Sequence, residues 1–239
     1  MLSSSFRFKR FTVCHDRCAM KVGTDGVLLG AWTSVNQCKN ILDVGTGSGL
    51  IALMLAQRNG LAAITAIDVD VDAVAQAKEN AIASPFKDRI EVKNISFQDF
   101  VKQTSTEFDC IVCNPPFFVN SLLSPDKRRN EARHALLLPI EELLFLSRKI
   151  ISLHGKLALV YPFERKRFLD ELIQETGWYI HRQTDVYSTP DSLPKRLLLE
   201  LSLVPSADSV IHNHLVIETQ RHHYSEEFVQ LAKDFYLYL

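Results

Sequence analysis

The sequence predicts an α/β fold, in which a doubly wound, mostly parallel sheet is closed by an antiparallel pair of strands. Short apolar runs alternate with segments of helical periodicity along most of the chain, as expected where helices join parallel strands. A glycine-rich turn separates the first of these runs from the next helix, which is typical of nucleotide-binding domains. The alternation stops near the C-terminus, where two strand-like runs follow each other with only a turn between them.

Each element is expected from its own local pattern. β-branched and apolar runs predict strands at 41–44, 64–67, 90–95, 108–113 and 155–161, and an antiparallel pair at 179–187 and 196–203. Periodic apolar residues predict helices at 27–32, 50–56, 136–152 and 163–176, and one more that Asp70 or Asp72 caps. Alternating aromatic and basic residues at 6–13 predict a short strand or arm, 97–101 predicts a turn or short helix, and 216–239 predicts a strand and an amphipathic helix.

The glycine-rich turn carries the first candidate binding site. It contains Gly45, Gly47 and Gly49, which permit a tight turn and leave bare backbone against a ligand. The third glycine comes one residue too early for a pyrophosphate-binding G-x-G-x-x-G turn, which favours S-adenosylmethionine over a dinucleotide. Asp68 ends the next strand, about 20 residues after the first glycine, where an acid can hold ribose hydroxyls.

The second candidate site is the corner Asn114-Pro115-Pro116-Phe117 at the end of the strand 108–113. Proline cannot extend a ladder of hydrogen bonds, so the strand stops here in a stiff turn. The Asn114 amide oxygen and the Pro115 carbonyl can each accept one N–H of a planar amine, and the Phe117 ring can stack on the attached base. An ordinary Pro-Pro loop is the alternative interpretation. Because both candidate sites follow strands, we expect them at the carboxyl edge of the sheet.

Thr24 and Asp25 precede the apolar helix 27–32, and the pattern leaves two roles open. Either residue can cap that helix. Either can instead contact the amino-acid end of a ligand.

Composition limits the other function classes. The 239 residues carry a net charge of −1, which is no overall nucleic-acid signature, so RNA binding would need a local basic patch. No apolar run is long enough to span a bilayer, and no signal peptide is evident, so we expect a cytoplasmic protein. Cys14, His15 and Cys18 lack a second ligand pair, and we expect no metal. Cys110 and Cys113 should face opposite sides of their strand and lie in the core.

The two motifs together resemble the class I S-adenosylmethionine-dependent methyltransferases, whose sheet is seven-stranded and Rossmann-like. Residues 43–49 look like their cofactor signature, and Asn-Pro-Pro-Phe looks like the [N/D]-P-P-[Y/F/W] of amino-methyltransferases. Residues 15–26, 52–58, 184–186 and 235–237 are similar to blocks of the bacterial tRNA1(Val) (adenine-37) N6-methyltransferases. The chain departs from them in two places, since Phe117 often stands as tyrosine there and Ser96 replaces an acid that bonds the cofactor adenine. Asp99 could substitute for that acid.

The resemblance implies methyl transfer from S-adenosylmethionine to N6 of a tRNA adenine turned out of the anticodon loop. Asn114, Pro115 and Phe117 would be catalytic. The implied cofactor-binding residues are Asp43, Gly45, Thr46, Gly47, Gly49, Asp68, Ser96, Phe97, Asp99, Thr24 and Asp25. For tRNA contact we expect Lys9, Arg10, Arg17, Lys21, Lys127, Arg128, Arg129, Arg133 and His134, although solvated surface is the alternative for each.

We expect one domain and a monomer. An N-terminal arm and cofactor-contacting helix (1–35) would precede a methyltransferase core (36–205), and a C-terminal strand and helix (206–239) would pack on it. Three rival functions remain open. The same fold could methylate a protein glutamine amide or a ribosomal RNA guanine N2, although such enzymes commonly carry an extra recognition domain. A non-catalytic cofactor- or RNA-binding protein is a rival of another class. A nicotinamide dehydrogenase is weaker, given the glycine spacing.

Overall fold

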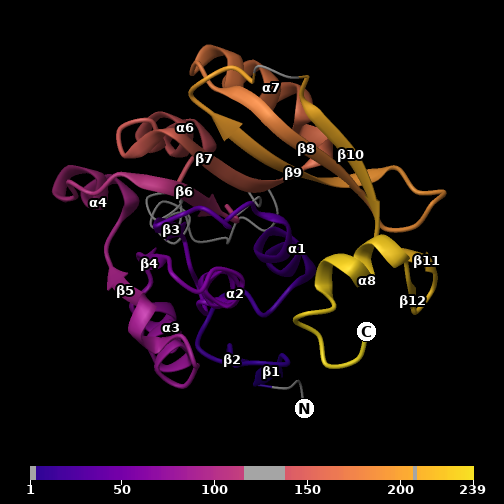
Figure 1. Ribbon diagram of the computed structural model, residues 1–239, viewed down its shortest axis with the longest axis horizontal. Helices are drawn as coiled ribbons and strands as arrows, with labels where there is room; N and C mark the ends of the chain where they lie inside the picture. The colour runs from indigo at the N-terminus through magenta and orange to yellow at the C-terminus, as the bar shows by residue number, and fades with distance from the viewer. Residues whose placement is uncertain (1–3, 116–137, 207–208) are drawn as a thin grey trace, which may run out of the picture.

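A computed structural model describes residues 4–115, 138–206 and 209–239. Its main sheet confirms the predicted α/β class, but it has eight strands instead of seven, in the order β10-β8-β9-β7-β6-β3-β4-β5 (Figure 1). The additional strand is β10 (Ile211–Val216), which pairs parallel with β8 at the edge of the sheet. The other strands of this sheet are β3 (Asn40–Val44), β4 (Ala63–Asp68), β5 (Ile90–Asn94), β6 (Phe108–Cys113), β7 (Ile151–Pro162), β8 (Tyr179–Tyr187) and β9 (Pro194–Ser202).

Helices cover both faces of this sheet. One face carries α1 (Thr24–Trp32), α2 (Leu50–Arg58), α3 (Val71–Ile82) and α8 (Glu226–Ala232). The other carries α4 (Phe97–Gln103), α6 (Ile140–Ser147) and α7 (Lys166–Glu175), the last preceded by a 3₁₀ turn, η2 (Phe163–Arg165). A second 3₁₀ turn, η1 (Lys87–Arg89), leads into β5.

Each face has its own hydrophobic core because side chains alternate along a strand. In β6, Cys110 belongs to the core under α1 and α2, whereas Cys113 belongs to the core under α4 and α6. Both cysteines are buried, which confirms the prediction that they point to opposite faces.

The antiparallel pair is confirmed, and its place in the sheet matters for function. β9 lies between β7 and β8 and runs antiparallel to both. Arg196 near its beginning is therefore opposite Pro162 at the end of β7. The start of β9 thus lies at the same rim as the carboxyl ends of the parallel strands.

The predicted helix 136–152 is wrong at both ends. Its described part is helical only over Ile140–Ser147, with Pro139 as the N-cap residue, and Ile151 already begins β7. The apolar residues Ile150 and Ile151 fit helical and strand periods equally well over so short a run. Ile151 is buried and pairs with Phe108 of β6, and this pairing favours the strand.

The two ends of the chain lie on the face of α1 and α2. The N-terminal segment is a hairpin of β1 (Ser5–Arg7) and β2 (Thr12–Cys14). After β10 comes a second hairpin of β11 (Glu218–Gln220) and β12 (His223–Tyr224), then α8, which packs against α1 (Figure 1). In the described ranges, none of the helices has the length and apolar character that crossing a membrane requires.

Candidate functional site

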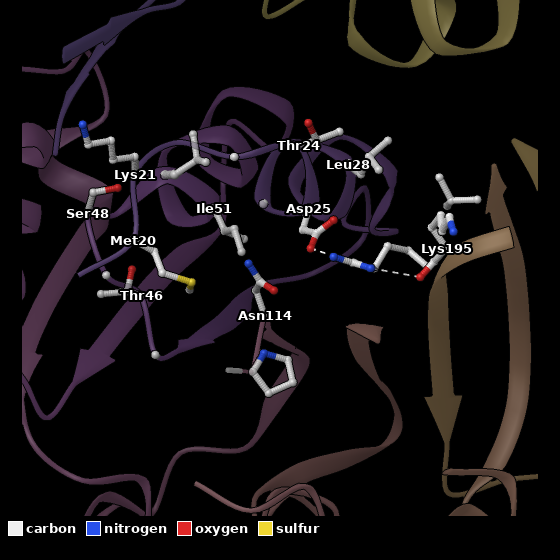
Figure 2. A pocket seen from close by; sticks show the side chains of 18 of the residues that line it. Met20, Lys21, Thr24, Asp25, Leu28, Thr46, Ser48, Ile51, Asn114 and Lys195 are labelled. Atoms are coloured by element: carbon white, nitrogen blue, oxygen red, sulfur yellow. Dashed lines mark hydrogen bonds and ion pairs between the residues drawn. The ribbon is translucent and has the colours of Figure 1, made fainter. Parts of the chain in front are cut away.

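A cavity of about 690 Å³ opens at the rim where the glycine-rich turn, the end of β6, the first turn of α1 and the start of β9 meet (Figure 2). This volume suits a nucleoside-sized ligand. Its lining includes Met20, Lys21, Thr24, Asp25, Gly45, Thr46, Gly47, Ser48, Asn114, Pro115, Ser188, Lys195 and Arg196. The two motifs found in the sequence therefore share one cavity.

The glycine-rich turn offers backbone to this cavity. Gly45, Gly47 and Gly49 have φ angles of +71°, +55° and +80°, which side-chain-bearing residues rarely adopt. A Cβ at Gly45 or Gly47 would meet no atom within 4 Å, so a ligand could approach the main chain there. Gly49 instead allows the turn to pack closely against α3, since a Cβ at this position would lie 3.3 Å from the Ala77 Cβ.

Two carboxylates hold the turn in place. Asp43 is buried at the end of β3, where its Oδ2 accepts hydrogen bonds from the Thr46 hydroxyl (2.6 Å) and the Ala52 N–H (3.1 Å). Burial raises the pKa of the Asp43 carboxyl to about 7, although both hydrogen bonds oppose the shift. Asp68 at the end of β4 accepts from the Gly47 N–H at 2.8 Å. Neither carboxylate is among the residues that line the cavity, so both act on the turn itself, Asp68 through Gly47, which does line it.

Asn114 follows β6 directly and is half-buried. In Figure 2 its side chain rises between Thr46 of the turn and Asp25 of α1. A Cβ added at Gly26 would lie 4.0 Å from the Asn114 amide nitrogen, so this amide lies next to the first turn of α1. Phe117 and Pro116 lie outside the described residues.

Thr24 and Asp25 do not cap α1. The N-cap residue is Gly23, which has no side chain to accept from the N–H groups of the first turn. Thr24 and Asp25 form the first turn itself and line the cavity. Asp25 Oδ2 accepts from Arg196 Nε at 2.8 Å, an ion pair that links α1 to β9 across the cavity (Figure 2). The capping alternative is therefore wrong, and the ligand-contact alternative stays a prediction.

Ser96, Phe97 and Asp99 are absent from the cavity lining. Ser96 caps α4 by accepting from the Asp99 N–H, and its hydroxyl donates to the Asp99 carboxylate at 2.9 Å. Lys102 also donates to Asp99, and these contacts lower the pKa of Asp99. The Phe97 side chain is buried in the core under α4, which leaves only its main chain for a ligand.

Four of the basic residues predicted to contact tRNA lie in the described ranges, and their surroundings differ. Lys21 lines the cavity. Arg17 pairs with Glu79, and the Lys9 ammonium donates to the Lys233 carbonyl. Arg10 lies over the Phe86 ring, close to where β5 begins and so toward the amino edge of the sheet. Of these four residues Lys21 lines the cavity and the other three do not, and the contact of each with tRNA stays a prediction. The other five predicted RNA contacts, Lys127, Arg128, Arg129, Arg133 and His134, lie outside the described residues.

Lys195 and Arg196 line the cavity but were not among the predicted site residues. Lys195 is exposed at the start of β9, opposite Lys21 across the cavity in Figure 2. In the sequence they could have been noticed as two adjacent cations at the beginning of a strand that follows the turn 188–193. Their place at the cavity depends on the order of strands, because the insertion of β9 beside β7 brings the start of β9 to the carboxyl rim.

The chain is similar to known methyltransferases. The family model described as "Methyltransferase small domain" matches residues 20–137. Among curated relatives, proteins of Parabacteroides distasonis and Bacteroides thetaiotaomicron are 52% and 46% identical, over 99% and 100% of both chains. A protein of Klebsiella pneumoniae is 40% identical, over 99% of this chain and 96% of its own length. All three are named tRNA1(Val) (adenine(37)-N6)-methyltransferase.

Solved structures show the same fold at low identity. A predicted O-methyltransferase from Agrobacterium tumefaciens is 18% identical with a TM-score of 0.65, covering 88% of this chain and 96% of its own. A putative RNA methyltransferase from Pyrococcus horikoshii is 17% identical with a TM-score of 0.52, covering 76% and 82%. At these identities the matches show the fold alone.

Proposed function

The chain belongs to the tRNA1(Val) (adenine(37)-N6)-methyltransferase family, and from this premise we propose that it methylates N6 of adenine-37 in tRNA1(Val). The methyl donor is S-adenosylmethionine, as for the class I methyltransferases. The observation that carries the proposal is the shared cavity, in which the glycine-rich turn and Asn114 face the same space. An adenine amine and a cofactor could meet there.

The residues around the cavity fit the cofactor. Gly45 and Gly47 present bare backbone because a Cβ at either would face open space. Asp68 carries carboxylate oxygens that suit ribose hydroxyls, and Asp25 carries a negative charge that suits an α-ammonium group. These residues would hold the cofactor, which supplies an electrophilic methyl carbon when bound.

Asn114 and Pro115 would hold the adenine amine. Each offers one oxygen acceptor, the side-chain amide oxygen and the main-chain carbonyl, so together they match the two hydrogens of an exocyclic –NH₂. Accepting both hydrogens draws the nitrogen lone pair out of conjugation and orients it toward the cavity. An amide is neutral at every working pH, so Asn114 holds the amine without first removing its proton. We propose that Phe117 stacks on the same base.

The charges at the rim support an RNA substrate. Lys21 and Lys195 lie on two sides of the cavity, where they could neutralise phosphates that flank a turned-out adenine (Figure 2). A tRNA substrate supports the predicted site of action in the cytoplasm.

The test is methyl transfer to RNA from a strain that lacks this gene. Purified protein and labelled S-adenosylmethionine are incubated with total RNA, and the nucleosides are separated by mass spectrometry. We expect label as N6-methyladenosine in the tRNA fraction, and none on a tRNA1(Val) transcript whose target adenine is replaced by guanine. Label in N2-methylguanosine of ribosomal RNA or in protein glutamine would favour one of the rival substrates. Cofactor binding with no label in RNA or protein would favour the non-catalytic alternative.

A further inference from the structure

Four polar side chains gather on one face at the edge of the sheet, and none of them lines the cavity. They come from β8 and β10, which pair in parallel with His212 opposite Gln183 and His214 opposite Asp185. Because side chains two residues apart share a face, this register places all four together. Figure 1 shows the two strands side by side, with β10 outermost.

Three of these side chains offer metal-ligand atoms close to one another. His212 Nε2 and Asp185 Oδ2 are 2.9 Å apart, and the rings of His212 and His214 have centroids 5.2 Å apart. One ligand atom from each of Asp185, His212 and His214 lies within 4.8 Å of the other two. Imidazole nitrogen and carboxylate oxygen are common zinc ligands.

The 2.9 Å separation is that of a His–Asp ion pair, and it is also close to the spacing of two ligands of one ion. With bond lengths of about 2.0–2.1 Å, two ligand atoms at a right angle around an ion are about 2.9 Å apart, and at a tetrahedral angle about 3.3 Å. His214 is exposed, so its ring can turn toward the same point without disturbing the core.

Gln183 behaves as an outer partner of such a site. It is buried and donates from Nε2 to Asp185 Oδ1 at 2.7 Å, which fixes the carboxylate with its other oxygen toward His212. Metal-binding carboxylates are usually oriented by a hydrogen bond of this kind.

Without an ion, the contacts of His212 conflict with one another. Its Nε2 faces the Asp185 oxygen at 2.9 Å and the Gln183 amide nitrogen at 3.2 Å. A protonated Nε2 satisfies the carboxylate but opposes the amide N–H. A bare Nε2 accepts from the amide but opposes the carboxylate. Flipping the Gln183 amide moves the conflict to Asp185, where two oxygens would then face each other. A cation bound to a bare Nε2 and to Oδ2 removes the repulsion between these two atoms. Because it occupies the only lone pair of Nε2, the Gln183 amide then keeps its bond to Asp185 Oδ1 alone.

We propose that Asp185, His212 and His214 bind one divalent transition-metal ion, with zinc the ion that this ligand set favours. Solvent completes the coordination, since two of the three ligands are exposed. The ion ties the edge strand β10 to β8 and so holds the C-terminal segment, whose helix α8 packs on α1. This role is structural and does not depend on the proposed methyl transfer.

The test is zinc titration of the metal-free full chain, prepared without a polyhistidine tag, by isothermal calorimetry. We expect one ion per chain with a micromolar or lower dissociation constant and a higher melting temperature in excess zinc. The variant His212→Ala/His214→Ala should bind at least about 100-fold more weakly and lose the zinc-dependent shift. Cobalt absorption should show the same stoichiometry in the wild type.

The matched control is His222→Ala/His223→Ala, which removes two exposed histidines from the neighbouring β11–β12 hairpin. It should bind zinc as the wild type does. Loss of binding in the control with retention in the His212/His214 variant would overturn the proposal, as would a wild type that binds no zinc. The single variant His214→Ala alters an exposed ring only, so its folding is not at issue, and it too should bind more weakly.

Discussion

The Asp68 carboxylate accepts a hydrogen bond from the backbone N–H of Gly47, and the two atoms are 2.8 Å apart. This contact fastens the glycine-rich turn after β3 to the end of the neighbouring strand β4. The other carboxylate oxygen accepts from the Asp70 N–H at 3.0 Å. Each oxygen still has a lone pair for a second donor, so Asp68 can shape the turn and hold a ribose together.

Asp68→Asn should therefore weaken cofactor binding. The substitution replaces one charged oxygen acceptor by an amide nitrogen, which donates. Hydrogen bonds to charged groups contribute about 1.5–3 kcal/mol, which corresponds to roughly 10- to 100-fold in affinity. Calorimetric titration with S-adenosylmethionine measures the change. The control is Asp70→Asn, which removes the same charge two residues away and keeps an equally good cap on α3. An equal loss in both variants would mean that the negative charge of the region matters, and not the Asp68 contacts.

Asn114→Ala should separate turnover from cofactor binding. The substitution removes the proposed amide acceptor for the adenine amine, and the loss of one positioned polar group costs about 10²–10³-fold in kcat. Cofactor affinity should stay within about 2-fold, because the glycine-rich turn and Asp68 remain. Asn114→Asp is the matched variant, since it keeps an oxygen acceptor at the same place, and it should retain more activity than alanine. Parallel losses of affinity and turnover in Asn114→Ala would contradict this division of roles.

The site could be predicted where its parts are contiguous in the chain. Gly45, Gly47 and Asn114 each follow directly on an apolar strand, and parallel strands bring their carboxyl ends to one rim, so their meeting followed from the fold class alone. Lys195 could not be assigned in this way, because its position depends on β9 entering the sheet between β7 and β8. A sequence pattern shows that two strands pair but not where the pair is inserted.

The cluster of His212, His214 and Asp185 also could not be predicted from the sequence. The sequence led us to expect no metal, since Cys14, His15 and Cys18 have no second pair of ligands. The three ligands come from strands separated in the chain, and their proximity depends on the register of β10 against β8. A slip of one residue would turn both histidines to the other face. Ion pairs of surface cations, such as Arg17 with Glu79, are equally hidden, because partners far apart in sequence leave no local pattern.

Asp43 should make stability depend on pH. Burial raises the pKa of its carboxyl to about 7, whereas an unfolded aspartate titrates near 3.9. Between these values the folded chain keeps a proton that the unfolded chain has lost, so raising the pH favours unfolding. The contribution to stability is complete below about pH 4, falls as the pH rises through about 7, and is constant above.

The measurement compares urea unfolding of the wild type and Asp43→Asn from about pH 5 to about pH 8. The introduced amide does not titrate, and its oxygen can keep the bonds from Thr46 and Ala52, while its NH₂ takes the place of Asp43 Oδ1, which has no partner among the described residues. We expect the free energy of unfolding of the wild type to fall by roughly 3 kcal/mol relative to the variant over this range. Parallel curves would mean that Asp43 is ionised throughout.

Gly30→Ala tests the close packing of α1 on α2. A Cβ at Gly30 would lie 2.8 Å from the Met54 sulfur and 3.0 Å from the Met54 Cβ. The sulfur could move aside, but Cβ cannot move without the backbone of α2. Overpacking costs about 1–3 kcal/mol, and the better helix propensity of alanine returns less than about 1. We therefore expect a net loss of about 1 kcal/mol, or a melting temperature lower by about 2–4 °C. Gly60→Ala is the control, since its Cβ would meet nothing within 4 Å, and an equal loss there would rule out the packing explanation.

Lys195→Gln tests whether the rim of the cavity contacts RNA. Lys195 is exposed at the start of β9 and lines the cavity, so it is placed to neutralise a phosphate next to the bound adenine. Removing one phosphate contact should weaken tRNA binding and lower the slope of log K against log salt concentration by about 1.

The control for Lys195→Gln is Lys39→Gln, which removes an exposed lysine just before β3 begins, at the opposite edge of the sheet. Filter binding of tRNA over a series of salt concentrations gives both slopes. Because the two variants have the same net charge, a difference between them reports position alone. We expect the slope to change in Lys195→Gln and to stay at the wild-type value in Lys39→Gln. Equal slopes in the two variants would place the RNA elsewhere on the surface, since a cation beside the bound phosphates must release a counterion that a distant one does not.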